Sequence, residues 1–301
     1  MILSGRIYFR KLERLGLDEK MAEYKPMLIL IILICVLLVG CAAPNAYRME
    51  NSDYGVFIGA DKETLNTILD DSGNYEIAVI EGQEFSSDEI SGFKVGGRMI
   101  YSYLNIGSLE TFRPYYTDFE DDILGEYENW PDEYWIDVSD KRWQNYISET
   151  IAKELYEKGV DGFFIDNCDV YYQYPTDEIY DGLINIMERL NKYDVDIIIN
   201  GGNEFVSQLI LDGRSGLIDG VNQEGVFSSI KDYDNDVFAK QDKEETEYFT
   251  QYLDMAKEAG LDVYLLEYTT DSGIAKEIET YCGREGFRYY ISCSVELDGQ
   301  G

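Results

Sequence analysis

Short runs of β-branched and aromatic residues alternate with amphipathic stretches along most of this chain, and this alternation is the feature that most constrains its fold. Strands that alternate with helices predict a parallel sheet, and eight such units in about 250 residues predict a single closed (β/α)8 barrel, a TIM barrel, with long βα loops. An open doubly wound sheet is the alternative, although no G-x-G-x-x-G or Walker motif supports it. The eight runs expected to be strands are Tyr54–Gly59, Ile77–Glu81, Arg98–Asn105, Gly162–Asp166, Asp196–Asn200, Ile218–Glu224, Val263–Tyr268 and Phe287–Ser292.

The clearest predicted helix is Asp140–Lys158, in which apolar residues such as Trp143 and Ile147 recur at steps of three and four. Ser139 or Asp140 is a suitable N-cap and Gly159 a suitable C-cap. The longest predicted loop covers residues 106–139 and is rich in aromatic and acidic residues. Further helices are expected over Asp177–Lys192, Glu204–Leu211, Glu244–Ala259 and Gly273–Gly283.

An apolar run, Met27–Gly40, precedes the predicted barrel. It is shorter than the roughly 20 residues of a membrane-spanning helix but typical of a signal-peptide core. The run leads into Leu38-Val39-Gly40-Cys41, which resembles the lipobox of bacterial and archaeal lipoproteins. We therefore expect a signal peptide over residues 1–40, a linker over 41–52 that follows lipidated Cys41, and the barrel over 53–301, outside the cytoplasm. An uncleaved anchor helix and a start at Met21 are the alternatives.

The formal net charge of the chain is −34. Such a surface repels nucleic acid and anionic lipid, so we expect no nucleic-acid partner, and contact with a membrane through the lipid anchor alone. It would attract a cationic polymer. An acidic surface that serves solubility is the alternative explanation.

The chain contains no histidine. This excludes Ser-His-Asp and Cys-His nucleophile systems, HExxH zinc sites and other histidine-ligated metals. Chemistry must come from Asp, Glu, Tyr, Lys or Cys, and we expect neither a metal nor a cofactor. Cys168, Cys282 and Cys293 follow the lipobox cysteine and form no CxxC motif, and a disulfide between Cys282 and Cys293 stays open.

Four predicted strands end in an acid, namely Glu81, Asp166, Glu224 and Glu267. A carboxylate at the end of an apolar strand is costly unless it is paired, hydrogen-bonded or protonated, and active sites of barrels gather at these strand ends. Glycoside hydrolysis requires one carboxylic acid and one carboxylate. Asp166 and Glu224 end alternate strands, whose inward side chains share a layer, so they form the predicted catalytic pair, with Glu267 as the next candidate.

Two other readings of the strand ends are a lysine-dependent aldolase and a phosphosugar enzyme. An aldolase would need a lysine at a strand end, and none of the eight predicted strands ends in one. A phosphate site would need a glycine-rich loop, whereas Thr269–Gly273 contains an acid. Sugar faces could stack on aromatic side chains near the strand ends and in the long loops, although ordinary packing explains each of them equally well. These side chains are Tyr101, Tyr103, Trp130, Trp135, Tyr171 and Tyr172.

Several motifs together resemble glycoside hydrolase family 114, the endo-α-1,4-polygalactosaminidase family. They are Tyr101–Arg113 (YSYLNIGSLETFR), Tyr134–Asp137 (YWID), Gly159–Asp169 (GVDGFFIDNCD), Asn200–Gly202 (NGG), Asn222–Glu224 (NQE) and Glu267–Tyr268. Ile165 stands where fungal members carry proline, which places the chain nearer the prokaryotic branch.

The resemblance implies a TIM barrel that acts on galactosamine-containing exopolysaccharide, with Asp166 and Glu224 as its catalytic pair. The expected substrate-binding positions are Tyr101, Tyr103, Asn105, Glu110, Arg113, Trp135, Asn167, Asp169, Asn200, Glu267 and Tyr268. The alternative from another class is a surface lipoprotein that binds polysaccharide without cleaving it. Retention or inversion depends on the carboxyl separation, which a sequence does not contain.

Overall fold

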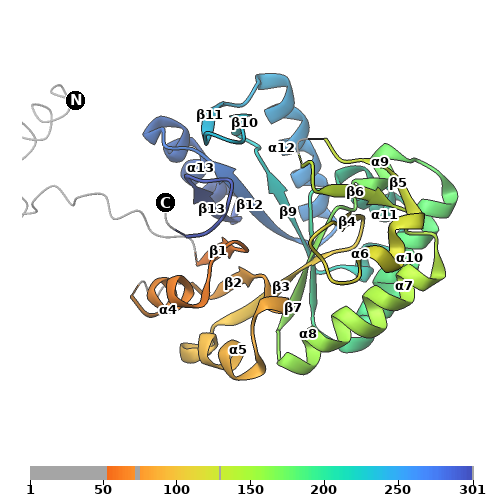
Figure 1. Cartoon of the computed structure of the whole chain (residues 1–301). Coiled ribbons are helices and arrows are strands. Elements are labelled where there is room, and N and C mark those ends of the chain that lie inside the picture. The colour runs from red at the N-terminus through yellow and green to blue at the C-terminus, as the bar shows by residue number, and fades with distance from the viewer. Residues whose placement is uncertain (1–52, 72–74, 129, 300–301) are drawn as a thin grey trace, which may run out of the picture. The chain divides into compact units, whose positions relative to one another are not determined.

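Eight parallel strands form the central sheet, in a computed structural model that describes residues 53–71, 75–128 and 130–299. The order is β1-β2-β3-β7-β8-β9-β12-β13, and β13 lies beside β1, so the barrel is nearly closed (Figure 1). This confirms the predicted TIM barrel, and no strand boundary differs from its expected position by more than two residues. The strands are β1 (Tyr54–Phe57), β2 (Ile77–Ile80), β3 (Met99–Asn105), β7 (Gly162–Asp166), β8 (Asp196–Asn200), β9 (Gly220–Glu224), β12 (Asp262–Tyr268) and β13 (Arg288–Ser292).

The predicted signal peptide and Cys41 lie outside the described residues. Within the part of the chain that the structure describes, no helix is long and apolar enough to cross a membrane.

The helices surround the barrel (Figure 1). They are α4 (Lys62–Asp71), α5 (Ser87–Phe93), α6 (Tyr116–Phe119), α7 (Lys141–Tyr146), α8 (Ala152–Lys158), α9 (Val170–Gln173), α10 (Asp177–Leu190), α11 (Asn203–Leu211), α12 (Lys243–Glu258) and α13 (Ser272–Glu285). The predicted helix Asp140–Lys158 is α7 and α8 joined by a π-helical turn, Ile147–Ile151. Its caps are as expected, because the Asp140 carboxylate accepts hydrogen bonds from two backbone N–H groups and Gly159 has φ 92°. Sequence patterns did not predict α4 and α5, which are short and polar.

Two apolar layers enclose the sheet. Inward-facing side chains such as Val56, Val79 and Phe164 fill the barrel, while outward-facing Phe163 and Ile165 pack against the helices. This follows from the alternation of side chains along a strand. The inner layer is not wholly apolar, since Asn222 on β9 is fully buried within the barrel.

The long loop after β3 contains a small antiparallel sheet that sequence patterns did not predict. Its strands are too short and too polar to show the alternation of a half-buried strand. The indole N–H of Trp143 on α7 donates to the carbonyl of Ile106 at 2.8 Å and ties this segment to the barrel. A second unpredicted element is a hairpin between β9 and α12. The added strands are β4 (Ser108–Glu110), β5 (Ile123–Glu126), β6 (Glu133–Ile136), β10 (Ser228–Asp232) and β11 (Val237–Lys240).

Gly107 connects β3 to this inserted sheet where two backbone segments meet. A Cβ atom at Gly107 would lie 1.7 Å from the carbonyl oxygen of Asn167. We therefore expect Gly107→Ala to lower the free energy of unfolding by about 1–3 kcal/mol, measured by urea denaturation. The control is Gly92→Ala on α5, where nothing lies within 4 Å and the change should stabilise by about 0.5–1 kcal/mol. Equal effects of the two substitutions would contradict this close packing.

Candidate active site

A cleft of about 730 Å³ opens at the carboxyl ends of the barrel strands. Of the described residues that line it, nine are Asp or Glu and one is Arg. Its walls come from strand ends, from the inserted sheet, from the hairpin region and from residues 295–297 near the end of the chain. A site of this composition favours a ligand that is polar or positively charged.

Asp166 and Glu224 lie together at the floor of the cleft, at the ends of β7 and β9. Asn200, at the end of the intervening strand β8, donates from Nδ2 to Asp166 Oδ1 at 2.9 Å and to Glu224 Oε1 at 2.7 Å. The expected convergence of the two carboxyls is therefore present in the structure. Because one nitrogen contacts both oxygens, these oxygens cannot lie further apart than the sum of the two distances.

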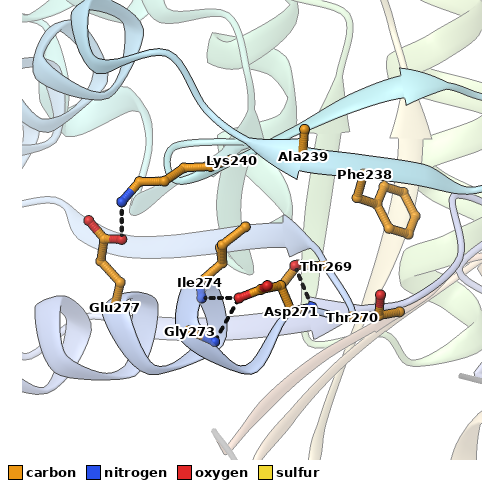
Figure 2. A pocket seen from close by; sticks show the side chains of 9 residues that line it. All are labelled: Phe238, Ala239, Lys240, Thr269, Thr270, Asp271, Gly273, Ile274 and Glu277. Carbon is orange, nitrogen blue, oxygen red and sulfur yellow. Dashed lines mark hydrogen bonds and ion pairs between the residues drawn. The ribbon is translucent and has the colours of Figure 1, made fainter.

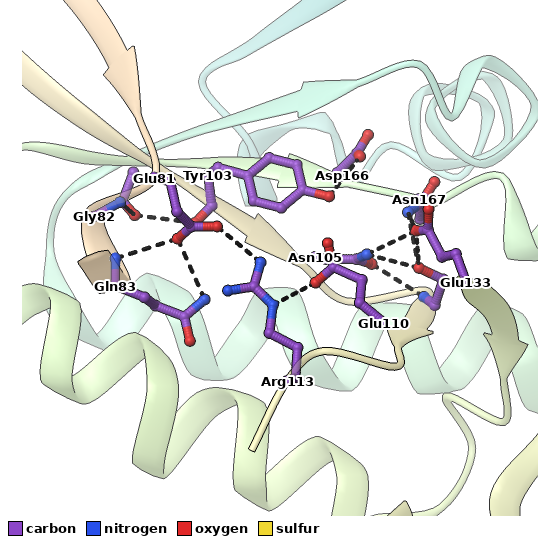
Figure 3. Close-up of polar contacts among 12 residues, drawn as sticks. Glu81, Gly82, Gln83, Tyr103, Asn105, Glu110, Arg113, Glu133, Asp166 and Asn167 are labelled. Carbon is purple, nitrogen blue, oxygen red and sulfur yellow. Dashed lines mark hydrogen bonds and ion pairs between the residues drawn. The ribbon is translucent and has the colours of Figure 1, made fainter. Parts of the chain in front are cut away.

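The remaining carboxyl oxygens of the pair bind two tyrosines. Tyr103 on β3 donates to Asp166 Oδ2 at 3.0 Å, and Tyr268 on β12 donates to Glu224 Oε2 at 2.9 Å (Figure 3 shows the Tyr103 contact). Each carboxyl thus accepts two hydrogen bonds from uncharged donors. This satisfies both oxygens of each group without placing a cation beside either.

Burial, and after it the neighbouring charge of Glu224, raises the pKa of Asp166 to about 8 against the opposing hydrogen bonds from Asn200 and Tyr103. Burial also raises the pKa of Glu224, against the bonds from Asn200 and Tyr268. Asp169 lies three residues after Asp166. Burial raises its pKa to about 6, although the Gly202 N–H donates a hydrogen bond to its carboxylate. The pair consequently retains a proton near neutral pH, and its titration belongs to both residues jointly.

Arg113 is the cation of the cleft wall, and two acids bind it. Its Nε contacts Glu110 at 2.5 Å and its Nη2 contacts Glu81 at 2.7 Å (Figure 3). Burial raises the pKa of Glu110 to about 7, even though the charge of Arg113 acts in the opposite direction. The positive charge is therefore compensated locally and does not neutralise Asp166 and Glu224.

Glu133, on inserted strand β6, also lines the cleft and was not predicted. Its Oε1 accepts from Asn105 Nδ2 at 2.9 Å, from Asn167 Nδ2 at 2.8 Å and from the Ser108 hydroxyl (Figure 3). Tyr127, directly after β5, donates to Asn167 at 3.1 Å. The motif residues after β3 and β7 thus hold an acid that sequence patterns could not locate, because its strand has no recognisable periodicity.

Glu267 is fully buried and does not line the cleft. Its carboxylate accepts from the backbone N–H of Phe227 at 3.0 Å and of Ser228 at 2.9 Å, and from the Ser228 hydroxyl at 2.5 Å. Burial raises its pKa to about 7 in spite of these bonds. Glu267 therefore fixes the start of β10, immediately after the strand that carries Glu224.

The predicted substrate-binding residues divide into two groups. Seven line the cleft and four do not. Tyr101 bonds Asp196 near the amino ends of the strands, and Trp135 stacks on Tyr127 with ring centroids 4.2 Å apart. Lining residues that were not predicted include Phe112, Tyr127, Glu133 and Tyr233. Of the loop aromatics considered for sugar stacking, Trp130 lines the cleft, whereas Tyr171 and Tyr172 do not. The seven are Tyr103, Glu110, Arg113, Asn167, Asp169, Asn200 and Tyr268, and the four are Tyr101, Asn105, Trp135 and Glu267.

A second groove, of about 560 Å³, lies between the β10–β11 hairpin and α13 (Figure 2). Lys240 pairs with Glu277 across it at 2.6 Å, and Asp271 caps α13, so its charged groups bind one another. The described cysteines Cys168, Cys282 and Cys293 are free thiols, so a Cys282–Cys293 disulfide does not form. Among the described residues no group of three or more Cys, Asp and Glu is arranged to hold a metal ion.

A (β/α)8 barrel with two carboxyls close together at the floor of an open cleft is the arrangement of a carboxylate-dependent glycosidase. The comparison with protein families agrees, because the model of glycoside-hydrolase family GH114 matches residues 50–301. The chain belongs to this family and is a glycoside hydrolase. This confirms the family resemblance of its motifs.

Solved structures with a similar fold share little sequence identity with this chain. The glycoside hydrolase domain of PelA from Pseudomonas aeruginosa is 16% identical with a TM-score of 0.67, over 82% of this chain and 96% of that one. Aspergillus fumigatus Ega3, in complex with galactosamine, is 15% identical with a TM-score of 0.64, over 86% and 97%. An α-galactosidase from Thermus thermophilus is 14% identical with a TM-score of 0.54, over 79% and 57%. None of the curated proteins compared with the chain matches it.

The raised pKa of Asp166 makes stability depend on pH. The folded state binds the proton up to about pH 8 while the unfolded carboxyl, with an ordinary value of 3.8, has lost it. This stabilisation is complete below the unfolded pKa and is lost as pH rises through the folded pKa. We expect Asp166→Asn to unfold at higher urea concentration than the parent at pH 8, with a smaller difference at pH 5. Asp181→Asn, on the exposed face of α10, is the control and should show no such pH-dependent gain.

Proposed function

We propose that this chain hydrolyses an extracellular galactosamine-containing polysaccharide with retention of anomeric configuration, using Glu224 as general acid/base and Asp166 as nucleophile. The observation that carries the proposal is the Asn200 amide, whose Nδ2 binds both carboxyls within the cleft. Retaining enzymes have carboxyls roughly 5–5.5 Å apart and inverting enzymes roughly 6.5–9.5 Å apart. The two bridged oxygens lie no further apart than the sum of these two hydrogen-bond lengths, which favours the first class, because the second needs room for a water molecule.

In the first step Glu224 protonates the glycosidic oxygen as the bond to the anomeric carbon breaks, and Asp166 forms a bond to that carbon. In the second step Glu224 takes a proton from water, whose oxygen attacks the anomeric carbon and releases the Asp166 carboxylate. The cycle needs one proton on the pair at its start. The raised pKa values of both carboxyls are consistent with that state.

The charge of the cleft supports a cationic sugar. Free galactosamine units carry an ammonium group, and the cleft presents nine acids against an arginine that Glu81 and Glu110 already bind. The structure of Ega3, which has a similar fold, was determined in complex with galactosamine, and this also supports an amino sugar as substrate. An ammonium near Asp166 would favour its ionised form, and the shared proton would then reside on Glu224.

Attachment to a membrane through lipidated Cys41 completes the proposal. The support is the apolar run that leads into the Leu38–Cys41 motif, together with the acidic surface of the chain, which anionic lipid would repel. A lipid anchor of several acyl chains holds a protein firmly where one chain does not. The barrel would then act on polysaccharide outside the cytoplasm.

Asp166→Asn and Glu224→Gln should each reduce kcat by orders of magnitude on a galactosamine polymer that the parent cleaves, since each amide removes one role of the pair. Reducing ends and mass spectrometry of the products measure the loss. Azide should restore turnover to the variant that lacks the acid/base with a product of retained configuration, and to the variant that lacks the nucleophile with an inverted product.

The matched control is Glu84→Gln, an acid of the same cleft that lies away from the pair's hydrogen bonds. A chain that binds the polymer but leaves its length unchanged would favour the non-catalytic surface lipoprotein. Near-parental turnover of both pair variants would instead remove Asp166 and Glu224 from the mechanism. Comparison of deacetylated with fully N-acetylated polymer tests the charge of the substrate separately from the catalytic pair.

Cys41→Ala should release the protein from the membrane fraction or leave its signal segment uncleaved, because the lipid is attached to that thiol. Membrane fractionation and the mass of the N-terminal peptide measure this. Cys293→Ala, a partly exposed thiol of the barrel, is the control and should leave fractionation unchanged. Unchanged membrane association of Cys41→Ala would show that the apolar run is an uncleaved anchor helix.

A further inference from the structure

Two polar side chains are fully buried inside the barrel, below the catalytic pair. Tyr54 begins β1 and Asn222 lies on β9, and both have 0% exposure. They lie among apolar side chains such as Val56, Ile198 and Leu266. A buried amide costs free energy unless hydrogen bonds satisfy it, so its partners define what it does.

The hydrogen bonds of these residues lead to the catalytic pair. The Tyr54 hydroxyl donates to Asn222 Oδ1 at 3.0 Å, and Asn222 Nδ2 donates to Asn200 Oδ1 at 2.7 Å. Asn200 then donates from its Nδ2 to both carboxyls. Asn222 pairs with Asn200 in the sheet register and lies two residues before Glu224 on the same face of β9.

The direction of these bonds determines which end of Asn200 meets the carboxyls. An amide has donors at its nitrogen and acceptors at its oxygen, so an inverted Asn200 would turn its oxygen toward two other oxygens. The Asn222 donor requires an acceptor and therefore holds the Asn200 oxygen downward. The Tyr54 donor holds the Asn222 oxygen in turn, which leaves the Asn222 nitrogen facing Asn200.

We propose that Tyr54 and Asn222 are positioning residues that orient Asn200, and through it set the spacing and proton affinity of Asp166 and Glu224. This inference rests on the proposed function, in which that pair performs the chemistry. Neither residue reaches the cleft, so neither contacts the substrate. Their removal should therefore change kcat and leave KM almost unchanged.

The kinetic test compares Tyr54→Phe and Asn222→Val with Tyr264→Phe in the full chain. Tyr264 is the matched control, because it is also buried in the barrel and its ring packs on Tyr54 at 4.8 Å, but Arg288 rather than Asn222 is its hydrogen-bond partner. We expect kcat to fall on the order of 10- to 100-fold for Asn222→Val and by several-fold for Tyr54→Phe, with little change in KM. Tyr264→Phe should keep the parental kcat.

A conservative variant tests the donor itself. Asn222→Asp preserves shape and donates to Asn200 only while its carboxyl is protonated, a state that burial favours. It should retain more of the parental kcat than Asn222→Val at low pH, and this advantage should shrink as pH rises. Equal losses for Asp and Val at every pH would overturn the donor role and leave a packing effect.

A carbon-13 NMR titration of the carboxyls provides a readout that needs no substrate. Asp166→Asn and Glu224→Gln assign the two signals. The Asn200 bonds favour the ionised carboxyls, so Tyr54→Phe and Asn222→Val should raise the pKa of Asp166 and Glu224, while Tyr264→Phe should not. The unaltered groups that also act on the pair are Tyr103, Tyr127, Glu133, Cys168, Asp169, Tyr233 and Tyr268. Tyr54 also interacts with Glu224 directly, so Asn222→Val is the variant that reports on Asn200 alone.

The outcomes separate the two proposals. If the parent cleaves no galactosamine polymer, the proposed function fails, and the titration alone decides the inference. If the parent is active and Tyr54→Phe and Asn222→Val match Tyr264→Phe in kcat and in carboxyl pKa, the inference fails and the function stands. If Asn222→Val does not fold, as thermal unfolding would show, the near-isosteric pair Tyr54→Phe and Tyr264→Phe decides.

Discussion

Two carboxyl groups, of Asp166 and Glu224, share one amide nitrogen at the mouth of this barrel, and hydrogen bonds around them offset the free-energy cost of burying them together. Burying two acids side by side is unfavourable, because each loses hydration and each raises the pKa of the other. The Asn200 amide, with Tyr103 and Tyr268, supplies four hydrogen bonds and no positive charge. A cation in place of these donors would neutralise the pair, so uncharged donors keep it able to hold one proton.

The segments inserted into the barrel complete the cleft and are themselves fastened by buried acids. Glu267 binds Phe227 and Ser228, where β10 begins, through two backbone N–H groups and a hydroxyl. Glu133 accepts hydrogen bonds from Asn105, Ser108 and Asn167 and so joins the small inserted sheet to β3 and to the loop after β7. Rigid strands thus position Asp166 and Glu224, and loops anchored to those strands form the walls of the cleft.

The acids of the cleft divide into those that pair with Arg113 and those that do not. Arg113 is bound on both sides, by Glu81 and Glu110, and its charge serves to hold the strand ends together. The acids left over face the cleft, where a neutral sugar would gain little from them and a protonated amino sugar would gain more. In the proposed function, charge selection and acid/base chemistry would therefore come from different acids of one site.

The sequence by itself determined the barrel, because hydrophobic periodicity records which faces are buried, and it determined Asp166, Asn200 and Glu224, because strand ends of a parallel barrel meet at one mouth. It could not distinguish Glu267 from Glu133. Both are acids near strand ends, yet the one predicted to meet substrate binds backbone and the unpredicted one lines the cleft. The bond between Tyr54 and Asn222 joins residues 168 positions apart, and the carboxyl spacing depends on how three neighbouring strands are aligned. Only the tertiary structure decided these features, because side-chain partners are set by strand order and register, which local residue patterns do not encode.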